Sequence, residues 1–487
     1  MILRRFYNDN LAQASYLVGC SVTGEALVVD PNRDAAEYVA AAAREGLRVT
    51  HVTETHIHAD FVSGLRELCA LSGATAYVSR MGGTDWQYAF AASDGAMLLS
   101  DHDVFMVGNI RIEALHTPGH TPEHLTFMVT DTAGADRPMG AFTGDFIFAG
   151  DVGRPDLLEK AAGLSGTMEA GARQLFASLQ HFKEYPDYLQ IWPGHGAGSA
   201  CGKALGAVPQ TTLGYERLFN WGLAEQAESA FVTEILSGQP TPPPYFAQMK
   251  NVNRAGPVVL GAPPSASMSD MKTLLATLDR GALAVDTRTW KEFAAEHVRG
   301  SINIALNKSF PTWAGSFIPY GQPFHLIAAD AASAERAVRE LSLIGLDDVA
   351  GVTLSEGLAA AREAGNTQAS DETGVAELQQ SLGDARTTVL DVRNPGEWLG
   401  GHVPADAPGT SGGAKVLHIP IEQLVARIAE VPRDERIMVH CKSGARSAIA
   451  TSILELHGIH AHNVRGGFDA WRAAGLPVSA AESGDKA

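Results

Sequence analysis

The sequence predicts an α/β protein made of several domains. Its 487 residues exceed what one hydrophobic core usually serves, since domains average roughly 150 residues. Short apolar runs such as ALVVD alternate with helical stretches such as AAEYVAAAARE, a pattern of strands and helices stacked in layers. A segment near the C-terminus also repeats an earlier one. We therefore expect about three compact α/β units.

Composition indicates an ordinary globular chain. Hydrophobic residues make up 45% and charged residues 19%, so the chain can bury a substantial core. The net charge is −18, and no cluster of Lys and Arg could neutralise a phosphate backbone, which argues against nucleic acid and anionic membrane as partners. The N-terminus lacks a signal-peptide pattern, and no segment has the roughly 20 apolar residues that span a bilayer. We expect a cytoplasmic protein.

The chain divides into four predicted segments. Residues 1–205 carry the layered α/β pattern, and residues 206–266 begin helical and end in the proline-rich QPTPPPYFAQ, which cannot continue a helix. This second segment is predicted to be a helical extension and linker. Residues 267–367 and 372–482 are tandem α/β domains, because one set of residues recurs with unchanged spacing. The first copy has Asp286, Arg288, Glu292 and His297, and the second has Asp391, Arg393, Glu397 and His402. A later change of offset predicts an insertion within residues 405–415.

A set of histidines and aspartates in the first segment predicts a metal site. TETHIHADFVSG supplies His56, His58 and Asp60 after an apolar strand, on a loop of the kind that often carries function. HTPGHTPEH, FTGDFIFAGD and WPGHG then supply His120, Asp145 and His195. Imidazoles and carboxylates together suit divalent transition metals. A lone HxH could be a polar loop, but four pieces in order are far more specific.

This order of motifs resembles the metallo-β-lactamase superfamily, which implies an αββα sandwich with metal bound between two sheets. In its two-metal hydrolases, including glyoxalase II, a histidine follows the aspartate of the motif; here that position is Phe61, which cannot bind metal. The loss favours one metal held by two imidazoles and one carboxylate, the donor set of non-haem Fe(II) oxygenases. That triad would be His56, His120 and Asp145.

Together with GRPD at residues 153–156, the pattern resembles the persulfide dioxygenase branch of the superfamily. The resemblance implies one Fe(II) per chain on that triad. Hydrogen-bonding residues around the triad would be His58, Asp60 and His195. Arg154 would bind the thiol substrate, with an exposed arginine or a structural ion pair as the alternative. Val152 stands where the family often has a cysteine.

Four widely spaced cysteines form neither a disulfide framework nor a CxxC zinc site. Cys20 and Cys69 are expected to be packing residues. Cys201 follows His195 closely and could approach the metal or accept a sulfane sulfur; a small buried apolar side chain is the alternative.

The last segment contains IMVHCKSGARSAIATSIL, which predicts a strand, a loop from Cys441 to Arg446, and a helix. Backbone N–H groups turned into such a loop, with the helix N-terminus, would stabilise a thiolate or persulfide, which makes Cys441 the expected nucleophile. CKSGARS, DVRNPGEW, GHVP and GGFDAW resemble the rhodanese family, with Arg446 closing the loop; phosphatases share the C(X)5R spacing. The middle copy has Ala328 or Ala329 in place of the cysteine, so it resembles an inactive rhodanese-like domain and is expected to be a scaffold.

The order of these domains along the chain resembles that of bacterial fusions of a persulfide dioxygenase with an inactive and an active rhodanese domain. This implies oxidation by O₂ of a low-molecular-weight thiol persulfide, such as glutathione persulfide, to sulfite in sulfide detoxification. Cys441 would form or use thiosulfate, and the sequence does not set the direction of this transfer. It also leaves open whether the chain forms a homo-oligomer. One alternative is a zinc-dependent glutathione thioester hydrolase with an appended sulfurtransferase. Another is a non-catalytic sulfur carrier or sensor.

Overall fold

The computed structural model describes residues 1–157, 159, 166–405 and 413–479. The chain forms two compact units, one of Met1–Pro264 with Arg339–Gly345 and the other of Ser265–Val338 with Leu346–Ala487. Among the helices of the described residues, none combines the length and hydropathy needed to cross a membrane.

The first unit contains two six-stranded sheets. One has the order β1-β2-β3-β4-β5-β6, antiparallel up to β3 and parallel from there on, and the other has the order β12-β11-β10-β9-β8-β7, antiparallel except for the pair β10 and β11. The strands of the first sheet are β1 (Ile2–Asn8), β2 (Gln13–Cys20), β3 (Glu25–Val29), β4 (Arg48–Thr53), β5 (Thr75–Ser79) and β6 (Met97–Leu99). Those of the second are β7 (Val104–Val107), β8 (Ile110–His116), β9 (Leu125–Asp131), β10 (Gly140–Gly144), β11 (Gln190–Pro193) and β12 (Thr211–Thr212).

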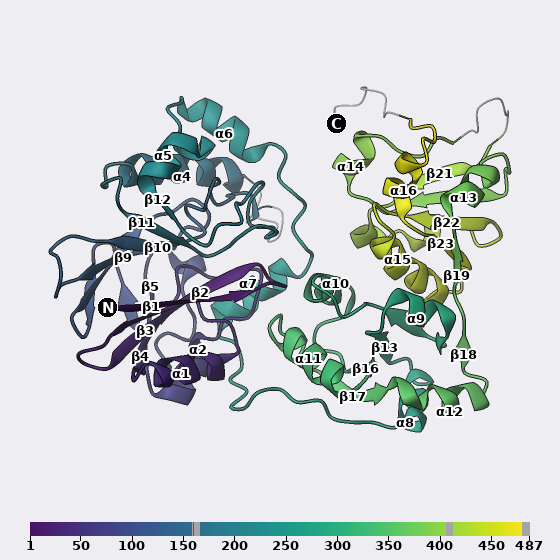
Figure 1. The fold of residues 1–487 in the computed structure, drawn as a ribbon, viewed down its shortest axis with the longest axis horizontal. Coiled ribbons are helices and arrows are strands. Elements are labelled where there is room, and N and C mark those ends of the chain that lie inside the picture. The colour runs from purple at the N-terminus through teal and green to yellow at the C-terminus, as the bar shows by residue number, and fades with distance from the viewer. Residues whose placement is uncertain (158, 160–165, 406–412, 480–487) are drawn as a thin grey trace. The chain divides into compact units, whose positions relative to one another are not determined.

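Helices cover the outer face of each sheet (Figure 1). The first sheet carries α1 (Ala35–Arg44) and α2 (Leu65–Ser72), and the second carries α4 (Thr167–Phe182), α5 (Leu213–Phe219) and α6 (Glu228–Leu236). The unit also contains η1 (Thr84–Trp86), η2 (Trp221–Leu223) and α7 (Phe246–Ala255). The predicted αββα sandwich is confirmed.

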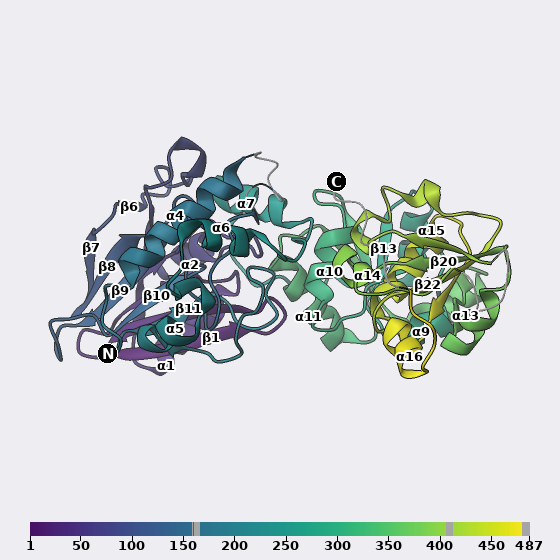
Figure 2. The same cartoon turned by 90° about the horizontal axis from the view of Figure 1, so that it is seen from above.

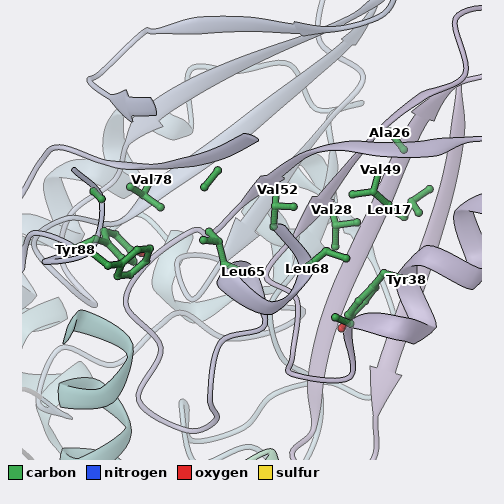
Figure 3. Close-up of a cluster of buried hydrophobic side chains, with 14 of the residues drawn as sticks. Leu17, Ala26, Val28, Tyr38, Val49, Val52, Leu65, Leu68, Val78 and Tyr88 are labelled. Atoms are coloured by element: carbon green, nitrogen blue, oxygen red, sulfur yellow. The ribbon is translucent and has the colours of Figure 1, made fainter. Parts of the chain in front are cut away.

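Strand β2 shows why the sheets stack. Successive side chains of a strand point to opposite faces, and every residue of β2 is buried, so both of its faces must be covered. Leu17 packs in the cluster between the first sheet and its helices, while Tyr16 and Val18 pack in the cluster between the two sheets. Figure 3 shows part of the outer cluster, with Tyr38 of α1 and Leu65 of α2 among the strand residues.

The second unit contains two parallel sheets, with the orders β15-β13-β16-β17 and β19-β23-β22-β20-β21, and a short antiparallel pair of β14 and β18. The strands of the middle domain are β13 (Leu283–Asp286), β14 (His297–Val298), β15 (Ser301–Asn303), β16 (Phe324–Ala328), β17 (Val349–Leu354) and β18 (Thr367–Gln368). Those of the last domain are β19 (Asp371–Thr373), β20 (Thr387–Asp391), β21 (Lys415–His418), β22 (Arg436–His440) and β23 (Ala461–Val464).

Helices follow most of these strands, as parallel pairing requires. In the middle domain they are α8 (Met271–Leu278), α9 (Trp290–Ala295), α10 (Phe310–Phe317), α11 (Ala331–Ser342), η3 (Ser355–Gly357) and α12 (Leu358–Glu363). In the last domain they are α13 (Val375–Ser381), α14 (Pro395–Leu399), η4 (Ile421–Gln423), η5 (Ile428–Glu430), α15 (Ala445–Leu456) and α16 (Gly467–Ala473). Figure 2 shows the last sheet between α15 and α16. The predicted α/β class is confirmed for both domains.

The two repeats are packed together within this unit. Helix α15 contacts β22 and β23 of its own domain and β15 of the middle domain. Asn303 N at the end of β15 donates to Ser452 Oγ of α15 over 3.0 Å. The insertion predicted within residues 405–415 falls between β20 and β21, but residues 406–412 lie outside the described part of the chain.

Candidate metal centre and sulfur-transfer loop

The first unit brings His56, His120 and Asp145 together. Each follows a strand: His56 comes after β4, His120 after β8, and Asp145 directly after β10. One ligand atom from each of the three lies within 4.8 Å of the others, and all three residues are buried. Three loops from two sheets therefore place two imidazoles and one carboxylate around one point.

Hydrogen bonds orient both imidazoles of this triad. His120 Nδ1 lies 2.8 Å from the carbonyl oxygen of Arg154, which can only accept, so Nδ1 carries the proton and Nε2 keeps its lone pair. His56 Nδ1 lies 3.0 Å from Thr55 Oγ1, and that hydroxyl donates to Asp30 over 2.9 Å. Such contacts on the far ring nitrogen are typical of metal-binding histidines.

The donor set fits a divalent transition metal. Both carboxylate oxygens of Asp145 are buried and accept no hydrogen bond from any described residue, and leaving a buried carboxylate without hydrogen bonds is costly. Burial, reinforced by neighbouring histidines, lowers the pKa of His56 well below its usual value, and burial lowers that of His120. Burial opposes ionisation of Asp145, but the surrounding histidines, His195 first, outweigh it and lower the pKa of Asp145. Two neutral imidazoles and an ionised carboxylate are the forms that bind metal.

The predicted surrounding residues lie beside the triad. His195 Nδ1 contacts the Ala12 carbonyl oxygen at 3.0 Å, and its Nε2 lies 3.4 Å from both Asp60 Oδ2 and Asp145 Oδ1. His58 Nε2 lies 3.1 Å from Asp30 Oδ1. His58 is thereby directed to a carboxylate outside the triad.

Phe61 occupies its place by packing. It is fully buried, and its ring centroid lies 4.4 Å from that of His58.

The thiol of Cys201 lies within 4.8 Å of ligand atoms of Asp60 and His195. Burial raises the pKa of this thiol well above its ordinary value, so the group is held as a neutral thiol. Cys201 therefore lies beside two of the predicted surrounding residues as a buried thiol, and its role stays a prediction.

Arg154 is buried with its guanidinium fully engaged. It forms two hydrogen bonds of 2.7 Å with Asp156 and donates to the carbonyl oxygens of Ala200 at 3.0 Å and Pro240 at 2.7 Å. The structural ion pair named as its alternative is present, and it joins the loop before Cys201 to the helical extension. Substrate binding by Arg154 stays a prediction.

Gly153 explains the glycine of the GRPD motif. A Cβ atom at this position would lie 1.7 Å from the carbonyl oxygen of Asp145. Only glycine allows the chain to pass so close to the triad.

Residues of the extension also shape the site, and the sequence did not indicate them. Asn253 of α7 donates through Nδ2 to the carbonyl oxygens of His58 at 2.8 Å and Phe61 at 2.7 Å, and its Oδ1 accepts from Ser63 N at 2.9 Å. Tyr245 Oη donates to the Asp60 carbonyl oxygen over 3.2 Å. The segment predicted only as an extension and linker therefore holds the loop that carries His58 and Asp60.

His124 also belongs to the HTPGHTPEH motif but lies outside the predicted triad. Its Nδ1 lies 2.8 Å from Thr117 Oγ1, and its Nε2 accepts from the backbone N of Asp145 over 3.2 Å. It thus supports the backbone of a triad residue rather than joining the triad.

In the last domain, Cys441 begins the loop between β22 and α15. Its Sγ accepts hydrogen bonds from Gly444 N at 3.1 Å and Ser447 Oγ at 3.5 Å, and the residue is 1% exposed. Arg446 pairs with Glu397 through two hydrogen bonds of 2.7 and 2.8 Å. Backbone and hydroxyl donors are therefore directed at the sulfur, as predicted for a sulfur-carrying thiol.

The GGFDAW segment supports the outer side of this loop. Phe468 N donates to the Cys441 carbonyl oxygen and Asp469 N to that of Lys442, both over 2.8 Å. Gly467 has φ +53°, and a Cβ atom there would lie 2.4 Å from the Cys441 carbonyl oxygen. With the carbonyl groups bound outside, the loop can present N–H groups to the sulfur.

The middle domain has no such loop. Strand β16 ends at Ala328 and α11 begins at Ala331, so only Ala329 and Asp330 separate them. Ala329 takes the place that Cys441 has directly after its strand.

Comparison with known proteins identifies two kinds of domain in the chain. The model of the metallo-beta-lactamase superfamily matches residues 8–195, and that of the rhodanese-like domain matches residues 270–359 and 374–474. The mitochondrial persulfide dioxygenase of Bos taurus is 31% identical over 201 residues, which cover 40% of this chain and 68% of the relative. A hydroxyacylglutathione hydrolase of Rhodopseudomonas palustris is 30% identical over 253 residues, covering 50% and 82%.

A solved metallo-beta-lactamase from Staphylococcus aureus is 45% identical with a TM-score of 0.67, covering 72% of this chain and 99% of that one. The chain belongs to the metallo-β-lactamase superfamily and carries two rhodanese-like domains after the superfamily domain. The predicted fusion is confirmed at this level.

Proposed function

We propose that the chain is an iron-dependent persulfide dioxygenase joined to a thiosulfate sulfurtransferase. The observation that carries this proposal is the triad of His56, His120 and Asp145 beside a buried Phe61. The triad supplies two imidazoles and a single carboxylate, and the phenyl ring supplies no donor for a second ion. The similarity to a persulfide dioxygenase supports the same reaction.

The triad would hold one Fe(II). Bound iron supplies the redox chemistry by which O₂ oxidises the outer sulfur of a thiol persulfide. Overall, one persulfide, one O₂ and one water become one thiol, one sulfite and two protons. The Arg154 carbonyl keeps His120 Nε2 free for metal, and burial of the triad excludes bulk water. Glutathione persulfide represents the proposed substrate class.

Cys441 would move sulfur in a separate step. Its thiolate attacks the outer sulfur of a persulfide, so the substrate S–S bond breaks, a new S–S bond forms on Cys441, and the thiol leaves. Sulfite then takes that sulfur from Cys441 to give thiosulfate and restores the thiolate. Gly444 N and Ser447 Oγ stabilise the negative sulfur in both stages.

A zinc-dependent glutathione thioester hydrolase is the second candidate. It is favoured by the similarity to a hydroxyacylglutathione hydrolase and by the second donor group of Asp60, His195 and Cys201. Such a reaction would hydrolyse a thioester and would consume no O₂.

The two candidates differ in metal content and oxygen uptake. Protein purified without oxygen should contain one iron per chain and consume O₂ when a thiol persulfide is added. His120→Ala should abolish oxygen uptake and leave sulfurtransferase activity intact, while His102→Ala, at an exposed site, should change neither. Two zinc ions per chain with thioesterase activity and no oxygen uptake would overturn the proposal.

A further inference from the structure

A second set of metal-binding side chains lies on the last domain, apart from the triad and Cys441. Strand β19 is an edge strand and pairs in parallel with β23, so that Asp371 is directly opposite His462. His460 lies two positions before His462. In extended chain, residues two apart point to the same face, so both imidazoles and the carboxylate share one face of the sheet edge.

The distances bring these three groups to one point. Asp371 Oδ2 lies 2.9 Å from His460 Nε2 and 3.9 Å from His462 Nδ1. The two rings are perpendicular, with centroids 5.1 Å apart. One ligand atom from each residue lies within 4.8 Å of the others, the same criterion that the buried triad meets.

We propose that Asp371, His460 and His462 form a surface site for a divalent transition metal ion. Two imidazoles and one carboxylate favour zinc, nickel or copper over calcium and magnesium, which prefer sets of oxygen ligands. The exposure of Asp371 and His460 leaves room for water at the remaining positions.

The position of the site gives it a structural role. β18 belongs to the middle domain and β19 to the last, with only residues 369 and 370 between them. A metal on Asp371 and His462 would join the first strand of the last domain to its neighbour in the sheet. It would therefore stabilise the edge strand where the chain enters this domain.

Nickel binding to the iron-loaded full-length chain tests this site. Isothermal titration should show one Ni²⁺ per chain with iron retained, and His462→Ala and Asp371→Asn should each weaken binding by about tenfold or more. The His460→Ala/His462→Ala double variant should bind no nickel at this affinity. His102→Ala is the matched control, because His102 also contacts two carboxylates, Asp101 and Glu113, but offers one imidazole.

Sulfurtransferase activity of each variant shows whether the last domain is folded. Unchanged nickel affinity and stoichiometry in an active double variant would overturn the proposal. So would wild-type binding no tighter than that of the double variant. Nickel should also raise the unfolding temperature of the wild type and leave that of the double variant unchanged.

Discussion

The two rhodanese-like domains share a framework and differ at the loop that would carry the chemistry. In both, an arginine two residues after a buried aspartate binds that carboxylate through its side chain. The closest contacts are 2.5 Å between Arg288 and Asp286 and 2.6 Å between Arg393 and Asp391. Both aspartates are fully buried, so each pair fixes the end of a central strand.

A stacked histidine is also common to both domains. His297 lies on Phe293 with ring centroids 3.7 Å apart, and His402 lies on Trp398 with centroids 3.8 Å apart. The interplanar angles are 9° and 4°. These residues therefore maintain the fold, since the domain without a cysteine keeps them as well.

The difference is concentrated between strand and helix. Two residues, 329 and 330, connect β16 to α11, whereas four, 441–444, connect β22 to α15. Glu292 accepts hydrogen bonds from Thr289 of its own helix cap, whereas the matching Glu397 also binds Arg446. The shared framework is therefore compatible with two loop lengths, and only the longer loop places hydrogen-bond donors around a thiol.

Loss of the loop thiol should have the largest effect. Cys441→Ser should lower sulfurtransferase activity with thiosulfate and cyanide by about 10³-fold or more, because a serine hydroxyl cannot hold a persulfide at neutral pH. Oxygen uptake should continue, and the product should change from thiosulfate towards sulfite. Undiminished enzymatic thiosulfate would mean that another thiol, such as Cys201, carries the sulfur.

Helix α15, which follows the Cys441 loop, should make the stability of the protein depend on pH. Helix α15 carries Glu455 near its end, and burial raises the pKa of this carboxyl to about 7. The unfolded chain releases this proton near pH 4.5 and the folded chain only near 7, so the contribution of Glu455 to stability should fall as pH rises through that window, by roughly 2–3 kcal/mol. His297 acts in the opposite direction, because burial lowers its pKa to about 4 and its imidazole is therefore protonated only in the unfolded chain between about pH 4 and 6.5.

Denaturant unfolding at pH 5 and pH 8 measures this dependence. Glu455→Gln should remove this contribution, so that its stability at pH 8 relative to pH 5 exceeds that of the wild type by roughly 2–3 kcal/mol, since the amide keeps a partner for Ser370 without a charge. An unchanged pH dependence in this variant would assign the effect to other groups.

The ion pair at the active loop should matter less than the thiol. Glu397→Gln removes the carboxylate from Arg446 and should lower sulfurtransferase kcat/KM by about 10-fold, or about 1.4 kcal/mol. Glu292→Gln at the matching position should leave this activity unchanged. Equal losses in both variants would show that these glutamates serve only to cap their helices.

A cysteine placed in the silent domain should have the smallest effect. Ala329→Cys in the Cys441→Ser background should restore no sulfurtransferase activity, because Asp330 alone separates position 329 from α11. Activity well above that of Cys441→Ser would show that the shorter loop can still activate a thiol.

Much of the metal centre could be predicted because its signals are local. Histidines two residues apart after a strand, and single residues after later strands, mark loop ends that the fold brings together. The close approach of His56, His120 and Asp145 was predicted in this way, and it is found in the structure. Their role in a reaction with O₂ remains a proposal. The loop from Cys441 was equally visible, since its strand, glycine and helix are consecutive in the chain.

The order of the domains and the grouping of His56, His120 and Asp145 could be predicted from the sequence alone, because they depend on neighbouring residues and on motif spacing. Only the tertiary structure decided how Asn253 holds the loop of His58, how Arg154 is engaged by Asp156 and distant carbonyl groups, and that Asp371 pairs with His462. Those contacts join segments far apart in the chain, and each depends on how helices and strands pack rather than on any local pattern.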